Sequence, residues 1–186
     1  MLKKYVISLK WYLALSSILF LCMAILGYIF GGELSYLWEN LQEYFGGLAG
    51  FHPLILIALV FVNNSIASLI AILLGVTLGI VPLLVSAVNG LIIGLAGFHT
   101  LQTESLTFFV LGILPHGVIE IPMFLLSTAI GIRIGVETIK KILGRESTVK
   151  RRLKNDLKFY AVRILPLLIL AALIEILITS SILMMF

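Results

Sequence analysis

Two side chains in a strongly apolar stretch have the chemistry to bind a cation or to carry a proton. His116 and Glu120 lie within Leu114–Pro122 and are four residues apart, so on a helix they share one face. An imidazole and a carboxylate are costly to bury in apolar surroundings unless each has a partner. The identity of that partner is the first question that this stretch raises.

Four further polar residues occur well inside other apolar segments: Asn63, Asn64, Asn89 and Glu175. An ionised carboxylate near the middle of a bilayer is expensive. We therefore expect the two glutamates to converge where a proton, a histidine or a metal ion compensates them.

The first hypothesis is a metal site formed by His116, Glu120 and Glu175. One imidazole and two carboxylates suit zinc or another divalent metal ion. Asn63, Asn64 and Asn89 are candidate hydrogen-bond donors that orient these ligands. The spacing lacks the His-Glu-x-x-His pattern of zinc proteases.

Three other hypotheses stay open. A metal with an open coordination position could activate water for intramembrane hydrolysis of a peptide or lipid bond. Ser65 and Ser68 have no histidine at a fixed spacing, so no catalytic residue is assigned. An enzyme is therefore the alternative interpretation. Protonatable groups beside a broken helix could serve transport. The same groups could also only hydrogen-bond helices together, at about 0.6 kcal/mol each.

The composition defines the setting in which these residues must fold. The chain has 186 residues, 61% of them hydrophobic and 12% charged, and a mean hydropathy of +1.17. A soluble domain is about half apolar and about a quarter charged. Because every backbone polar group in a bilayer must be satisfied and strand-like alternation is absent, the sequence predicts an all-α polytopic transmembrane helical bundle.

Five apolar segments are long enough to span a bilayer, at residues 11–30, 53–74, 82–98, 106–135 and 159–183. We interpret the first as a retained span, because no small-residue cleavage site follows it. Residues 33–45 have the spacing of an amphipathic helix, either in the outer interface or against a partner. Together, residues 1–186 are expected to form a single transmembrane domain.

The net charge of +4 is concentrated near the N-terminus and in a basic segment at residues 140–158. This distribution is typical of cytoplasmic segments and not of a nucleic-acid-binding protein. We expect a multi-pass protein of the cell (cytoplasmic) membrane with a cytoplasmic N-terminus and an external C-terminus. Arg133 should reach the inner headgroups, and His52 and His99 should be solvated at interfaces.

The fourth apolar segment has 30 residues without a polar break, from Leu106 to Gly135, and Pro115 divides it. We favour a broken or re-entrant segment, in which a half-helix at residues 106–114 reaches about 13 Å into the bilayer. The alternative is a surface helix followed by a plain span that starts at His116. Gly90 and Gly94, with Gly97 after them, would let another helix approach closely and suggest a homodimer.

Several of these pieces resemble the stage II sporulation protein M family of integral membrane proteins. They are Phe61-Val62-Asn63-Asn64, Asn89-Gly90-x-x-x-Gly94, Pro115-His116-Gly117-x-x-Glu120-x-Pro122, Gly131-x-x-x-Gly135 and Glu175 in the last span. The resemblance runs in order from about Pro53 to the end. It implies a polytopic membrane protein, without a catalytic assignment that can be transferred.

The namesake of that family works with peptidoglycan-remodelling proteins during engulfment of the forespore, and many relatives occur in organisms that do not sporulate. The resemblance thus implies other membrane or cell-envelope proteins as partners, besides the bilayer. The function we expect is a membrane scaffold or transport component with a metal or ion site. The alternative is an intramembrane metal-dependent hydrolase.

Overall fold

The structure of the chain is a computed structural model that describes residues 2–48, 50–183 and 185. The described residues form helices and no strands, which confirms the all-α prediction. Five helical stretches are long and apolar enough to cross a membrane: Lys10–Ile29, Pro53–Val76, Ile80–Thr103, Leu106–Ile142 and Val149–Leu183. The chain is therefore a polytopic helical membrane protein by the length and composition of its helices.

Three of the stretches are simple helices, namely α2 (Lys10–Ile29), α5 (Ile80–Thr103) and α6 (Leu106–Ile142). Helix α4 (Pro53–Leu73) ends in the 3₁₀ turn η1 (Leu74–Val76). The last stretch runs without a gap through α7 (Val149–Phe159), the π-helical η2 (Tyr160–Ile164), α8 (Leu165–Ile174), the π-helical η3 (Glu175–Thr179) and α9 (Ser180–Leu183). Two short helices, α1 (Leu2–Ser8) and α3 (Ser35–Gly46), complete the fold.

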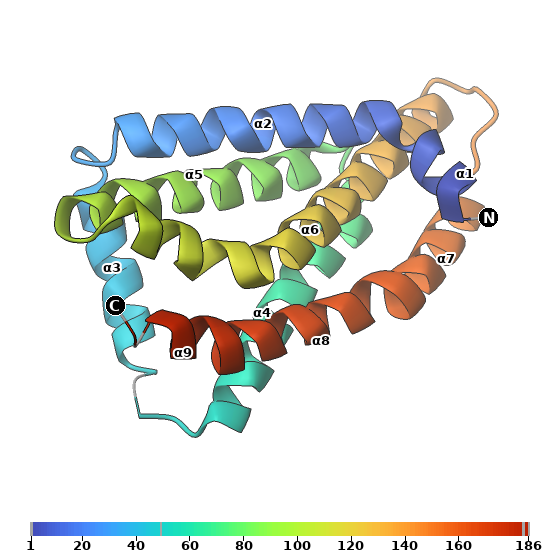
Figure 1. Ribbon diagram of the computed structural model, residues 1–186. Helices are drawn as coiled ribbons and strands as arrows, with labels where there is room; N and C mark the ends of the chain where they lie inside the picture. The colour runs from blue at the N-terminus through green and yellow to red at the C-terminus, as the bar shows by residue number, and fades with distance from the viewer. Residues whose placement is uncertain (1, 49, 184, 186) are drawn as a thin grey trace.

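The connections gather at two opposite ends of the bundle. Helix α1 and the connection from α6 to α7 lie at one end, whereas α3 and α9 lie toward the other (Figure 1). All lysines and arginines belong to residues 3–10 and 133–163, which are the parts of the chain toward the first of these ends. The bundle is therefore strongly asymmetric in charge along its long axis.

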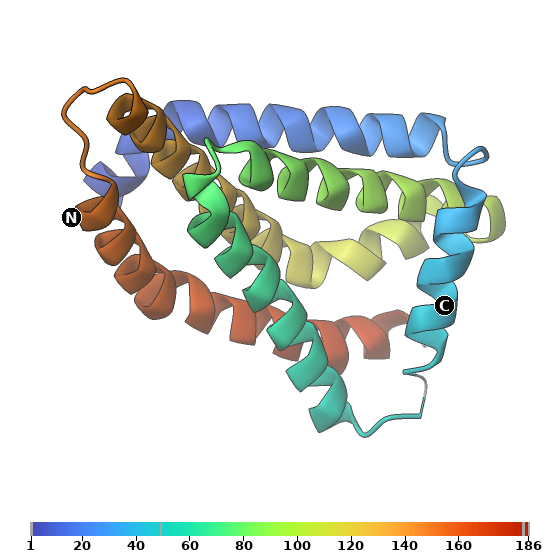
Figure 2. The ribbon, with the colours of Figure 1, turned by 180° about the vertical axis from the view of Figure 1, so that it is seen from behind.

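Helices α2 and α5 lie side by side over most of their length (Figures 1 and 2). A Cβ atom on Gly90 would overlap the carbonyl oxygen of Phe20, and one on Gly94 would overlap that of Ala24. The small residues thus let two backbones of the same chain meet. The spacing from which we predicted a homodimer is used inside one chain, so it no longer supports that prediction.

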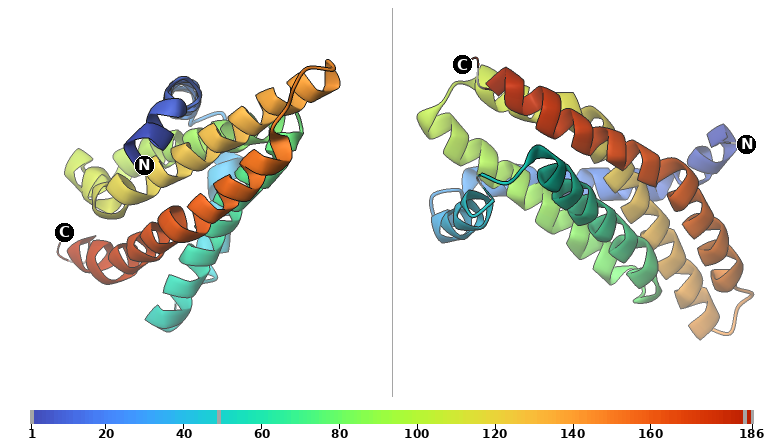
Figure 3. Two further views of the ribbon diagram at one scale, coloured as in Figure 1. Left: turned by 90° about the vertical axis from the view of Figure 1, so that its right-hand side faces the viewer. Right: turned by 90° about the horizontal axis from the view of Figure 1, so that it is seen from below.

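Helices α4, α6 and α8 contact one another on the other side of the bundle (Figure 3). Their shared core lies nearer the α1 end and includes Ile72, Ile130, Ile134, Ile164 and Leu168. Gly131 faces the backbone of α4 so closely that a Cβ there would overlap the carbonyl oxygen of Ala71. Residues of α4, α6 and η3 outside this core line a cavity.

The segment expected to break at Pro115 is one continuous helix, α6, with Pro115 and Pro122 inside it. Its ribbon changes direction in the half nearer its N-terminus (Figure 1). A proline removes one backbone hydrogen bond and its ring crowds the preceding turn, which bends a helix without having to end it. In a bilayer the remaining backbone groups are best satisfied by continuing the helix. The favoured re-entrant arrangement is therefore replaced by a bent span.

The prediction for Arg133 was wrong. Its side chain is 5% exposed and its Nη2 donates a hydrogen bond of 2.6 Å to Oδ1 of Asp156, which is 1% exposed. Tyr5 donates its hydroxyl proton to the same oxygen at 2.6 Å and accepts a hydrogen bond from Arg133 at 3.1 Å. We call Tyr5, Arg133 and Asp156 the inner ion cluster. A carboxylate within reach is a better partner for a buried guanidinium than distant headgroups.

His99 is not a solvated surface residue. Its ring is half-buried and stacks on Trp38 of α3, with ring centres 5.2 Å apart and planes 2° apart. Its Nε2 lies 3.2 Å from the carbonyl oxygen of Gly31. His99 thereby fastens α3 to α5, whereas His52 is exposed and accepts a hydrogen bond from the backbone N–H of Leu54.

Candidate functional site

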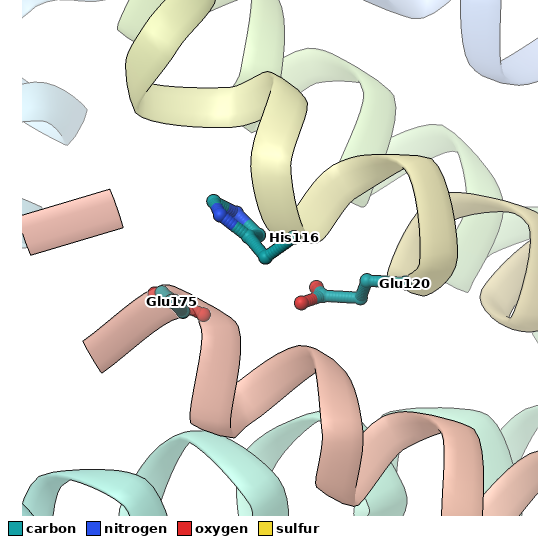
Figure 4. Close-up of side chains that lie close together, drawn as sticks. All are labelled: His116, Glu120 and Glu175. Carbon is teal, nitrogen blue, oxygen red and sulfur yellow. The ribbon is translucent and has the colours of Figure 1, made fainter. Parts of the chain in front are cut away.

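The two spans that carry His116, Glu120 and Glu175 bring these three side chains together. His116 and Glu120 come from successive turns of α6, and Glu175 comes from the first position of η3. Figure 4 shows the three side chains in the space between these two helices. One ligand atom from each residue lies within 4.8 Å of the others. We call this group the His-Glu-Glu site.

The residues of the His-Glu-Glu site lie well inside the two candidate spans that carry them. His116 is ten residues beyond the start of α6 at Leu106, which corresponds to about 15 Å along a helix axis. That is roughly half the thickness of a hydrocarbon core. His116 has this position in one long helix, and not at the end of the half-helix that we favoured from the sequence.

Helix η3 gives Glu175 its local geometry. It is a π-helical stretch, a form that widens the helix by one residue and is frequent at functional sites. At its other end Thr179 is 3% exposed, and its Oγ1 lies 3.4 Å from Nδ1 of His116. Thr179 was not among the site residues predicted from the sequence. Its spacing of four residues from Glu175 in an apolar span was the signal that could have identified it.

Two of the three candidate asparagines lie at the site. Nδ2 of Asn63 donates a hydrogen bond of 3.3 Å to Oδ1 of Asn64, and the Asn64 side chain lies beside the Glu120 carboxyl group. Asn89 does not lie there. It is on α5 and donates a hydrogen bond of 2.9 Å to the Val85 carbonyl oxygen of its own helix.

A cavity of about 410 Å³ adjoins the His-Glu-Glu site. The three site residues contribute polar side chains to its lining, as do Asn63 and Asn64. The remaining described lining comes from α3, the connection that follows it, α4 and η3, and consists of Tyr44, Leu48, Leu56, Leu59, Val60 and Ile176. A mostly apolar cavity with a few convergent polar groups is the usual form of a ligand site.

No lysine or arginine among the described residues pairs with the carboxylates of the site. The salt bridges among the described residues involve Glu137 and Asp156, and neither Glu120 nor Glu175 takes part in one. Among the described residues, Oε2 of Glu120 is buried without a hydrogen-bond partner. An imidazole and two carboxylates, one of which has an unpartnered oxygen, form a donor set that fits a divalent cation.

The fold and the site define the class first: a polytopic helical membrane protein in which polar side chains from three candidate spans come together. Residues 16–180 match the family described as Stage II sporulation protein M, and the chain belongs to that family. The matched range contains all residues of the His-Glu-Glu site, both site asparagines and Thr179. No curated protein and no solved structure matches the chain.

Proposed function

We propose that this member of the Stage II sporulation protein M family binds a divalent metal ion, zinc in the first instance, within the membrane. The observation that carries the proposal is the approach of His116, Glu120 and Glu175, whose ligand atoms lie within 4.8 Å of one another. In this site the imidazole and the two carboxylates are the ligands. Asn64 lies beside Glu120, and Thr179 lies beside His116. Each would orient its neighbouring ligand, as hydrogen-bond partners of metal ligands commonly do.

Electrostatics supports a cation at this position. Two carboxylates so close together repel each other, and low-dielectric surroundings strengthen the repulsion. A divalent ion removes the repulsion and supplies a partner for the buried Oε2 of Glu120. Protonation of the carboxyl groups is the competing solution, and it predicts no bound metal.

A second candidate, a metal-dependent intramembrane hydrolase, is favoured by the cavity beside the site. Three protein ligands leave one coordination position open, as in catalytic zinc sites, and the 410 Å³ space provides room for a substrate. When bound, the ion would polarise a carbonyl group and lower the pKa of water. Asn63 and Asn64 would hold the carbonyl group by hydrogen bonds. A transport role lacks such support, because α6 is not broken into half-helices.

We infer that the end of the bundle with α1 and the α6–α7 connection faces the cytoplasm of a cell membrane. All basic residues belong to segments toward that end, and basic residues are concentrated on the cytoplasmic side of membrane proteins. The five candidate spans then bring α9 to the outside. Homodimers and cell-envelope partners stay predictions.

Metal content of the purified protein tests the proposal. We expect about one zinc ion per chain after reconstitution and gel filtration, measured by elemental analysis. His116→Ala, Glu120→Gln and Glu175→Gln should each remove most of it. Asn89→Ala is the matched control, because Asn89 is also an amide in a span but lies off the site. Absence of bound metal in the unmutated protein, or full retention in the three variants, would overturn the proposal.

X-ray absorption at the zinc edge separates the two candidates. A fourth oxygen ligand from water, in addition to the three protein donors, would favour the hydrolase. A closed shell of protein donors alone would favour a structural or scaffold role.

A further inference from the structure

We propose that the cavity beside the His-Glu-Glu site binds a neutral single-chain acyl ester or amide. The carbonyl group would lie at the asparagines and the metal, and the hydrocarbon chain would lie along α4. The inference rests on the proposed metal site, which forms the polar end of the cavity. It adds the chemical class of the ligand.

The cavity wall changes from polar to apolar along one face of α4. Val60, Leu59 and Leu56 precede Asn63 by three, four and seven residues, which is the spacing of one helical stripe. Seven residues of helix correspond to about 10 Å. From there the described lining continues to Leu48, in the connection between α3 and α4. A ligand that fits this wall has its polar group at one end and an apolar chain at the other.

The charge of the site selects a neutral headgroup. A divalent ion and two glutamates sum to zero, so a ligand carboxylate or phosphate would add an uncompensated charge at mid-bilayer depth. No lysine or arginine belongs to the described lining of the cavity. A carbonyl oxygen avoids this cost and still accepts hydrogen bonds from asparagine amides.

The side-chain amide of Asn63 has an unused hydrogen-bond donor in the cavity lining. Asn63 is exposed in the middle of α4, and among the described contacts its amide donates to Asn64 alone. An amide that faces hydrocarbon with unused hydrogen-bonding capacity is unfavourable. A carbonyl group bound in the cavity would satisfy it.

The cavity can be reached from the bilayer. Leu59 lines it and is 38% exposed, and Asn63 is exposed as well. Exposed side chains of a spanning helix face lipid, so a membrane-dissolved amphiphile can enter past them. The volume of about 410 Å³ lies within the roughly 300–1,000 Å³ of small-molecule sites.

Photolabelling tests the inference, with a monoacylglycerol that carries a diazirine in its acyl chain as the probe. The zinc-loaded full chain in detergent is labelled with increasing probe, and the sites are mapped by mass spectrometry. We expect saturable labelling on α4 at Leu56–Val60. Leu56→Trp and Val60→Phe, which fill the apolar part of the cavity, should each reduce labelling about tenfold and leave one zinc per chain.

The matched control is Ile55→Trp. Ile55 is adjacent to Leu56 but 49% exposed and outside the cavity lining, so labelling should not change. A fatty-acid probe with the same chain tests the headgroup, and we expect about tenfold weaker labelling because it is anionic. Equal labelling by both probes, or unsaturable labelling that Leu56→Trp and Val60→Phe leave unchanged, would overturn the inference. Zinc content is read separately, so a chain that binds zinc without labelling contradicts only this inference, whereas a chain without zinc contradicts the proposed function.

Discussion

The two buried clusters of charged residues in this protein are compensated in opposite ways. The inner ion cluster contains its own cation: Arg133 and Asp156 lie 2.6 Å apart, and Tyr5 hydrogen-bonds both. The His-Glu-Glu site contains two carboxylates and no lysine or arginine partner among the described residues. A cluster with a built-in counter-ion is complete and ties helices together, whereas one without it calls for an ion or a proton from outside.

The location of each cluster matches this difference. The inner ion cluster joins α1, α6 and α7 where the packing leaves Asp156 1% exposed. The His-Glu-Glu site adjoins a cavity of about 410 Å³. The comparison therefore predicts that mutations in the first cluster change stability and that mutations in the second change ligand binding.

The largest effect is expected for Asp156→Asn. It leaves the Arg133 guanidinium buried without a charged partner, which typically costs about 3–5 kcal/mol of unfolding free energy. Equilibrium unfolding in mixed micelles would measure the loss. The control is the double variant Arg133→Met, Asp156→Leu, which should recover most of the lost unfolding free energy. The reason is that Nε of Arg133 and Oδ2 of Asp156 have no partner among the described residues even in the native pair. A loss below about 1 kcal/mol for Asp156→Asn would show that the inner ion cluster is not required for stability.

The next effect concerns zinc. At a free zinc concentration of 100 times the dissociation constant, binding should raise the unfolding free energy by about 2.7 kcal/mol. Glu120→Gln should remove this increment, yet without metal it should be as stable as the unmutated chain or slightly more so, because one of two repelling carboxylates is gone. The same unfolding experiment with and without zinc provides the test. Strong destabilisation of metal-free Glu120→Gln would mean that this site is structural like the other.

Tyr5→Phe should cost about 1–3 kcal/mol, because it removes a hydrogen bond to a charged group. Burial, and then the neighbouring Asp156 carboxylate, raise the pKa of the Tyr5 hydroxyl above its ordinary value of 10.0. A pKa that is higher in the folded state gives stability that is fully present below about pH 10 and is lost as the pH rises toward the folded pKa. The stability difference between the unmutated chain and Tyr5→Phe, followed from neutral pH to above pH 10, should therefore shrink only at the alkaline end. A difference that shrinks near neutral pH would refute this assignment.

The smallest stability change is expected for Thr179→Val. The contact between Thr179 and His116 is 3.4 Å long, and hydrogen bonds between membrane helices contribute about 0.6 kcal/mol on average. Zinc affinity should nevertheless fall by about tenfold or more, since partners of metal ligands orient them. A zinc titration of Thr179→Val beside Thr179→Ser, which keeps the hydroxyl, would separate this role from packing. Equal affinities in both variants would remove Thr179 from the site.

Much of the architecture was predictable because hydropathy is a local property. Runs of about 20 apolar residues define spans whatever their neighbours are, and five such helices are present. The pairing of His116 with Glu120 followed from helical spacing alone. The approach of Glu175 followed from the high energy of a lone carboxylate in a bilayer.

The choice among equivalent polar residues was not predictable. Asn64 and Asn89 have similar surroundings in the sequence, but only Asn64 faces the site, because the rotation of a helix is set by what it packs against. For the same reason Gly90 and Gly94 could not be assigned to a contact within the chain or between chains. The structure uses both against α2.

The membrane class, the helical spans and the pair at His116 and Glu120 were therefore predictable, since each follows from composition or from spacing along one helix. Contacts between distant segments explain the outcomes that the sequence left open: Arg133 pairs with Asp156, Thr179 approaches His116, and α6 continues through Pro115. Those outcomes depend on contacts between segments far apart in the chain. Their energies are set by which faces meet, and a linear pattern does not contain that information.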